Sequence, residues 1–259
     1  MTSLPRLLFA DQLGPHFDDG GPIIIPEVLS PLKRRHYHRQ KAHLIVSALR
    51  HRVAELGDRV SAISASSYHD ALQGRDFSAV NPTSRGLRNL VQDLSLSATV
   101  EVLPSRGFVS SEEDFAHWVE TQGAKRLVME NFYQDRRRAT GILMNVGPSG
   151  VSNPEGGSYN FDKDNRQPPP KGVDTLGVPS AWYPKENAID QEVRAYLDDL
   201  EARGEVSFIG EDGPRLFPAT RAEALEALEV FITDRLATFG PSEDAAMVGD
   251  WAMSHSLLS

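Results

Sequence analysis

The 259-residue sequence contains no cysteine. Disulfide bonds and thiolate-ligated clusters therefore cannot form within these residues. Long apolar runs are also absent, because no stretch approaches the roughly 18 residues that a transmembrane helix needs. The first ten residues have too short an apolar core and the wrong flanks for a signal peptide. We therefore expect a cytoplasmic protein with no membrane partner.

Several catalytic signatures are missing too. No glycine-rich dinucleotide fingerprint follows the first apolar run, and the chain has no Gly-x-Ser-x-Gly elbow, no Gly-Lys-Ser/Thr phosphate loop and no His-Glu-x-x-His. A chain that lacks these constellations is better explained as a pocket or scaffold domain than as a complete enzyme.

The charge balance restricts the partners. A net charge of −9 argues against a surface built throughout for nucleic-acid phosphates, although one local basic groove remains compatible with it. Residues 33–41 form the dense basic cluster of the chain. This cluster either meets a phosphate or forms a solvated helix entry. Its histidines, His36 and His38, are two residues apart and cannot share one side of a helix, which disfavours a metal site.

Apolar periodicity indicates the fold. Short β-rich runs are expected at 6–10, 22–26, 59–64, 79–80 and 99–103, and helices at 39–56, 67–72, 83–94 and from 110 onward. Thr83 is the expected cap of the third helix, and Ser110 with Glu113 has capping-box spacing for the fourth. Strands that alternate with helices at this pace predict an open, doubly wound α/β fold with a parallel sheet.

The second half changes character. Residues 145–185 are rich in Gly, Pro, Asn and Ser and predict a long functional loop or linker. Helices follow at 187–204 and 220–239, the latter with Thr220 as its cap and Gly240 as its stop. We expect an α/β domain at 1–144, a linker at 145–185 and the first helices of another domain at 186–259.

Two polar residues follow the first strand. Asp11 and Gln12 lie where open α/β sheets bind ligands, beyond the carboxyl ends of the strands. They could hydrogen-bond a small heteroaromatic compound or a nucleotide. The other interpretation is an Asx turn before Gly14 and Pro15.

An aromatic and basic segment, 129–144, precedes a polar loop at 159–171. We expect Phe132 and Tyr133 to anchor a helix to the sheet, with the arginines at 136–138 exposed. In the loop, short polar side chains can bond their own backbone, and Arg166 can pair with a carboxylate or a phosphate.

The wording of 129–144 and 159–171, together with the final His-Ser-Leu-Leu-Ser, resembles the bacterial photolyase-related flavoproteins, the iron–sulfur branch of the cryptochrome/photolyase family. The resemblance implies that this chain is the front half of such a protein, cut where the loop that binds the FAD diphosphate begins. A partial FAD site would then comprise His255, Ser256, Leu257, Leu258 and Ser259. The four cysteines of the cluster would lie in the missing half.

The same resemblance implies a pocket for a lumazine-type antenna chromophore, lined by Asp11, Gln12 and Glu27. Two further pocket positions, an acid and a tyrosine in the family, fall on Pro31 and Arg34 here. A basic residue in place of an aromatic one indicates a different ligand, such as a phosphorylated compound, or none.

The family reaction is light-driven repair of ultraviolet-damaged pyrimidines by electron transfer from reduced FAD to a base flipped out of damaged DNA. The resemblance thus implies a DNA photolyase-type lyase, and we expect this chain alone to hold no flavin and to repair nothing. The alternatives are a blue-light signalling cryptochrome and a complete nucleotide-binding regulatory module, in which Asp11 and Arg34 would contact an adenine nucleotide. The oligomeric state cannot be predicted.

Overall fold

The computed structural model describes residues 4–123, 125–147, 150, 152–165, 167–175, 177, 179–242 and 247–248. They divide into two compact units. The first contains the described residues of Met1–Gly107 and Gly177–Phe239, and the second contains those of Phe108–Leu176 and Gly240–Ser254. The domain boundaries expected from the sequence stay predictions.

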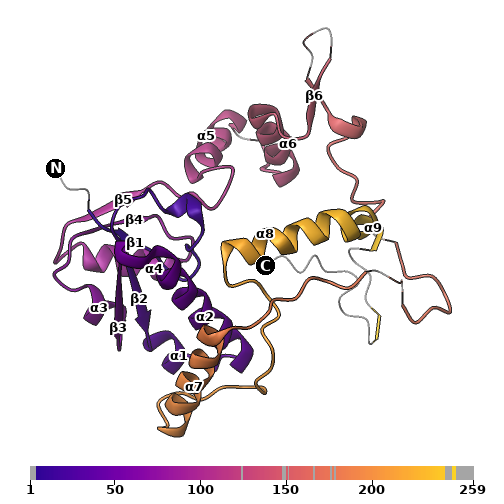
Figure 1. Ribbon diagram of the computed structural model, residues 1–259. Coiled ribbons are helices and arrows are strands. Elements are labelled where there is room, and N and C mark those ends of the chain that lie inside the picture. The colour runs from indigo at the N-terminus through magenta and orange to yellow at the C-terminus, as the bar shows by residue number, and fades with distance from the viewer. Residues whose placement is uncertain are drawn as a thin grey trace. The chain divides into compact units, whose positions relative to one another are not determined.

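The first unit is built on a five-stranded parallel sheet in the order β3-β2-β1-β4-β5 (Figure 1). The strands are β1 (Arg6–Leu7), β2 (Ile23–Val28), β3 (Val60–Ala65), β4 (Phe77–Val80) and β5 (Val100–Leu103). The chain runs outward from β1 through β2 to β3 and then returns to the other side of β1 for β4 and β5. This is the doubly wound α/β arrangement that the alternating pattern predicted.

Helices cover both faces of this sheet. Successive residues of a strand point to opposite faces. Leu7 and Phe9 accordingly pack with Leu72 and Leu94 from helices α3 (Tyr68–Leu72) and α4 (Arg85–Leu94). Leu8 belongs to a separate cluster that includes residues of helix α2 (Arg39–Leu56). The apolar runs of the three central strands, β1, β2 and β4, are therefore buried from both sides, as the middle of a parallel sheet requires.

Local capping sets where the helices begin. Helix α2 has the predicted bounds and ends at Gly57, whose φ of 55° is a conformation that suits glycine. Two predicted caps are wrong by one residue. Ser84, not Thr83, caps α4 by accepting a hydrogen bond from the backbone of Leu87.

Helix α5 (Glu112–Gln122) begins with a capping box of Ser111 and Asp114, not of Ser110 and Glu113. The Asp114 backbone N–H donates to the Ser111 hydroxyl at 3.0 Å, and the Ser111 N–H donates to the Asp114 carboxylate at 2.8 Å. An aspartate thus takes the place of the expected glutamate.

The later part of the first unit is helical. Helix α7 (Ala188–Ala202) packs against α1 (Ser30–Arg34) and α2 through a cluster that includes Leu32, Val46 and Leu197. Helix α8 (Arg221–Val230) begins after Thr220, as predicted, and continues through a wider π turn (Phe231–Arg235) into α9 (Leu236–Ser242). Gly240 therefore does not end the helix, since one glycine costs a helix only about 1 kcal/mol.

The second unit contains α5, α6 (Met129–Thr140) and an antiparallel pair, β6 (Met144–Val146) with β7 (Ser152–Pro154). A short 3-10 turn follows at Glu155–Gly157, and the first unit has two such turns, at Pro15–Phe17 and Gly57–Arg59. The ring of Phe132 on α6 lies 5.1 Å from that of Phe115 and 5.2 Å from that of Trp118, measured between centroids. Phe132 thus anchors α6 to α5, which corrects the expected contact with the sheet.

Among the described residues, no helix combines the length and the apolar character that crossing a membrane would require.

Candidate functional site

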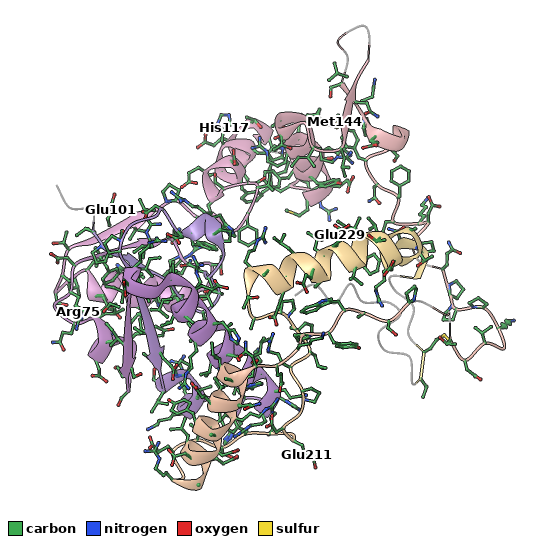
Figure 2. All side chains as sticks on the ribbon, in the orientation of Figure 1. Arg75, Glu101, His117, Met144, Glu211 and Glu229 are labelled. Carbon is green, nitrogen blue, oxygen red and sulfur yellow. The ribbon has the colours of Figure 1, made fainter. Side chains whose placement is uncertain are left out.

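A pocket of about 630 Å³ opens in the first unit, where strands β1, β2 and β3 end. Its lining comes from the end of β2, from residues that follow β1, β2 and β3, and from helices α1, α2, α3, α4 and α7. The volume lies in the range of small-molecule sites, which is about 300–1,000 Å³. Figure 2 shows Arg75 and Glu101, which do not line this pocket, projecting from the margin of the first unit.

Most of the pocket wall is apolar. The side chains of Phe9, Val28, Leu87 and Leu90 line it and also belong to or pack against the core beneath the sheet. Tyr68 adds an aromatic face, with its ring 5.5 Å from that of Phe9 in an edge-to-face arrangement. Walls of this kind favour a flat, apolar ring system.

Two polar groups interrupt this wall beside Phe9. Asp11 is exposed and lines the pocket, and the Tyr68 hydroxyl interacts electrostatically with its carboxylate. Burial, with a smaller contribution from Asp11, raises the pKa of Tyr68 to about 12. The phenol therefore stays protonated near neutral pH, so that it offers a hydrogen-bond donor next to a carboxylate acceptor.

Glu27 lines the same pocket but is already paired. Its two carboxylate oxygens accept hydrogen bonds from Arg50 at 2.8 and 2.9 Å. The Arg50 guanidinium also lies over the ring of Tyr196, 4.6 Å from its centroid. The hydrogen bonds that Arg50 donates to Glu27 raise the pKa of Arg50 more than burial lowers it. Glu27 is thus a fixed part of the pocket wall, and Arg50 neutralises its charge.

The basic cluster at 33–41 separates into paired and unpaired residues. Lys33 binds Glu205 at 2.9 Å, and Arg39 binds Asp198 at 2.5 Å. Arg34 and Arg35 line the pocket, are exposed, and form no ion pair with any part of the chain that the structure describes.

Gln12 lies at the switch point of the sheet instead of in the pocket lining. Its side-chain amide donates to the Val80 carbonyl at 3.2 Å, which connects the ends of β1 and β4. The residue is 2% exposed, and its Oε1 atom has no hydrogen-bond partner among the described residues. The structure thus brings Asp11, Glu27 and Arg34 together and leaves Gln12 apart from them.

The pocket lining also includes Arg35 and Tyr37 from the basic cluster at 33–41. Tyr68 and Asn89, which belong to no motif of the sequence, contribute to it as well. A signal for Tyr68 was present, because it follows the third strand as directly as Asp11 follows the first. Asn89 belongs to a helix, and its position in the pocket depends on how α4 packs against the sheet.

The second unit has a shallower hollow of about 600 Å³ around Arg137. This arginine is 6% exposed, which corrects the expectation that all three arginines of α6 are exposed. Its guanidinium lies over the rings of Tyr133 and Tyr159, at 5.6 and 5.3 Å from their centroids. It also donates to the carbonyl oxygens of Ile142 and Leu143. Arg137 therefore ties the polar loop to α6.

The partial FAD site expected at His255, Ser256, Leu257, Leu258 and Ser259 lies outside the described residues, as does Arg166. Within the described ranges, no three His, Asp or Glu side chains are grouped so as to hold a metal ion.

Comparison with known proteins identifies relatives of this chain. Residues 6–207 match a family described as "Deoxyribodipyrimidine photo-lyase-related protein". The chain is also 32% identical, over a 280-residue alignment, to a protein of Agrobacterium fabrum named "(6-4) photolyase". That alignment covers 98% of this chain and 52% of the relative, so the chain spans about half the length of the protein it matches.

Proposed function

Because the chain belongs to the deoxyribodipyrimidine photo-lyase-related family, as the motifs indicated, we propose that it serves in the light-dependent repair of damaged DNA. The name of the Agrobacterium fabrum relative supports this proposal. Because the chain spans about half of that relative, the full reaction is proposed for a longer flavoprotein that contains these residues. In that protein, reduced FAD would donate an electron to a damaged pyrimidine.

Within that activity, the first unit acts as an antenna-type domain. The observation that carries this proposal is the pocket at the ends of β1, β2 and β3, lined by Asp11, Glu27 and Arg34. A bound chromophore such as a lumazine would absorb light and pass its excitation energy to the flavin.

The residues of the pocket fit a flat heteroaromatic compound. Phe9 and Tyr68 offer aromatic contacts, while Asp11 and the Tyr68 hydroxyl offer an acceptor and a donor for ring N–H and carbonyl groups. Arg50 holds Glu27 in one orientation, so this carboxylate shapes the wall and remains charge-neutralised. Gln12 has no place in this arrangement, since it binds the backbone of Val80.

A binding titration tests the antenna proposal. A lumazine added to the purified chain should bind saturably, with its fluorescence changed by the aromatic wall. Asp11→Ala should weaken binding about tenfold, because a hydrogen bond to a charged group contributes about 1.5–3 kcal/mol. Asp58→Ala, which removes an exposed carboxylate outside the pocket, serves as the matched control. Absence of saturable binding would contradict the antenna role, and equal affinities of both variants would exclude Asp11 as a ligand contact.

A specific observation also supports one alternative function, a nucleotide-binding regulatory module. A nucleotide-binding regulatory module requires Asp11 and Arg34 in the same pocket, and both line it. Adenine nucleotides therefore belong among the compounds that the pocket should be offered. Light signalling in place of repair is a further alternative, and activity on damaged DNA under illumination separates the two.

A further inference from the structure

We propose that the pocket of the first unit recognises a phosphorylated aromatic ligand, with Arg34 and Arg35 as the phosphate contacts. This inference rests on the proposed function, because it names the ligand class of the same pocket. It adds a contact that a neutral ring compound cannot make, between an anionic group and the end of the pocket formed by α1.

The contacts of the basic side chains at 33–41 show which of these cations remain available to a ligand. The neighbouring cations are already engaged in contacts that hold the fold together: Lys33 binds Glu205, Arg39 binds Asp198, and Lys41 lies over the ring of Tyr37. Arg34 and Arg35 have no carboxylate partner in the described part of the chain, although both line the pocket. Arg34 and Arg35 are consecutive residues of that lining, and a dianion is the ligand group that two guanidinium groups can contact together.

The backbone holds these two arginines in place. Leu32, two residues earlier, is 7% exposed and packs in the cluster between α1, α2 and α7. The backbone N–H groups of Leu29 and Ser30 donate to the carbonyl oxygens of Ala65 and Ser66 at the end of β3. Because its start and its centre are fixed, this short segment loses little backbone conformational entropy on binding a ligand.

The charges of the pocket also give the ligand an orientation. Glu27 is neutralised by Arg50, which leaves Asp11 and Asp93 as the acidic residues of the lining. Neither carboxylate forms an ion pair with Arg34 or Arg35, so the acidic and basic groups occupy separate positions in the described structure. A ring with N–H donors near Asp11 and a phosphate near the arginines satisfies both.

Matched ligand pairs test the phosphate contact. FMN and riboflavin share one ring and one ribityl chain and differ by a phosphate, as AMP and adenosine do. With the complete 259-residue chain, we expect FMN to bind about tenfold or more tightly than riboflavin, measured by fluorescence titration at constant ionic strength. If the pocket prefers adenine rings, AMP should bind more tightly than adenosine by a similar factor.

Arginine variants assign the contact. The double variant Arg34→Gln and Arg35→Gln should reduce the affinity for the phosphorylated compound to that of its unphosphorylated partner. Both side chains are exposed, so the substitutions should leave the fold intact, which circular dichroism checks. Arg75→Gln is the matched control, because Arg75 is exposed and does not line the pocket (Figure 2). Its affinities should equal those of the unaltered chain.

The outcomes separate the two proposals. Equal affinities within each pair, or a phosphate preference that survives the double variant, would overturn the phosphate contact and leave the antenna pocket standing. If none of FMN, riboflavin, AMP, adenosine and the lumazine binds, both proposals are overturned together. Preferential binding of the phosphorylated compound that disappears in the double variant supports the inference.

Discussion

Asp190 shows how one residue holds the first unit together. Its side chain is fully buried on α7, where it accepts hydrogen bonds from the Ser47 hydroxyl, from the Asn187 backbone N–H at 3.0 Å and from Arg215 Nε at 3.0 Å. Burial alone would raise the pKa of Asp190, but these donors outweigh it and the pKa falls below its usual value of 3.8. Arg215 also binds Glu223 at the start of α8, at 2.8 and 2.9 Å.

Asp190→Asn should therefore destabilise the protein strongly at neutral pH. The substitution leaves the buried Arg215 with one carboxylate partner in place of two, and the loss of one member of a buried pair costs about 3 kcal/mol. Asp199→Asn on the same helix is the control, because Asp199 is exposed and its pair with Arg203 contributes about 0.5 kcal/mol. Urea unfolding followed by circular dichroism measures both. Equal losses of unfolding free energy in the two variants would show that the buried ion pair stabilises the protein no more than the exposed one.

The same measurement has a defined pH dependence. A carboxyl group whose folded pKa is lowered contributes stability at pH values above its unfolded pKa and loses it as pH falls through the folded value. The difference in unfolding free energy between the unaltered chain and Asp190→Asn should thus be constant near neutral pH. It should shrink below pH 3.8, the ordinary pKa of this group. A difference that grows on acidification contradicts the assignment of a charged Asp190.

The sequence allowed some of these residues to be predicted and not others. Asp11 and Glu27 follow or end strands, so the strand pattern alone puts them at the edge of a parallel sheet where ligands bind. The partnership of Asp190 with Ser47 joins residues 143 positions apart and depends on how α7 packs against α2. No local pattern carries that information. The hydrogen bond from Gln12 to Val80 could not be predicted for a similar reason, because Val80 belongs to another strand.

At the scale of elements, α5 and α6 form an aromatic helix pair. Trp118 on α5 is 5% exposed, and its ring contacts those of Phe115 and Phe132. Arg136 on α6 adds an ion pair to Asp114 at 2.7 Å, the residue that also closes the capping box of α5. The two helices are therefore stabilised chiefly by each other.

Trp118→Ala should loosen α5 and α6 and leave the sheet protected. Removing a buried aromatic side chain costs about 3–5 kcal/mol, and the loss falls on the helix pair that the ring joins. Hydrogen exchange of the backbone amides should accelerate in residues 112–140 and stay unchanged in β1 to β5. Phe108→Ala serves as the control, because Phe108 belongs to the same unit but is 68% exposed. Equal acceleration in the sheet would show that the two units unfold as one.

Elements differ in how far a sequence predicts them. The start of α8 at Thr220 and the bounds of α2 follow from capping residues and apolar spacing, which are local signals. Neighbouring serines and threonines compete as caps, which explains the one-residue errors at Ser84 and Ser111. The partner of Phe132 is set by tertiary packing, so an aromatic residue on a helix predicts burial without naming the surface that buries it.

At the scale of the whole molecule, strand order determines where the pocket can form. The buried amide of Gln12 occupies the reversal between β1 and β4, and the pocket opens beyond the ends of β1, β2 and β3, with α4, which follows β4, as one of its walls. The sequence predicted the parallel sheet from its alternating strands and helices. It could not predict the contact of Gln12 with β4, because that contact joins residues 68 positions apart in the chain.

The extent of the chain leads to a prediction about flavin. The chain spans 52% of the Agrobacterium fabrum relative, and the FAD contacts expected within it are limited to His255 and the four residues after it. Five terminal residues can contact a diphosphate but cannot enclose an isoalloxazine ring, and a cofactor of that size is held when most of its surface is buried. We therefore expect the purified 259-residue chain to retain no stoichiometric FAD after expression or after incubation with excess FAD and gel filtration. Retention of one equivalent of FAD would contradict this expectation. It would show that the 259-residue chain binds FAD by itself. Retention of FMN that is lost in the Arg34→Gln and Arg35→Gln double variant would instead assign the flavin to the α/β pocket, because that variant leaves the terminal residues untouched.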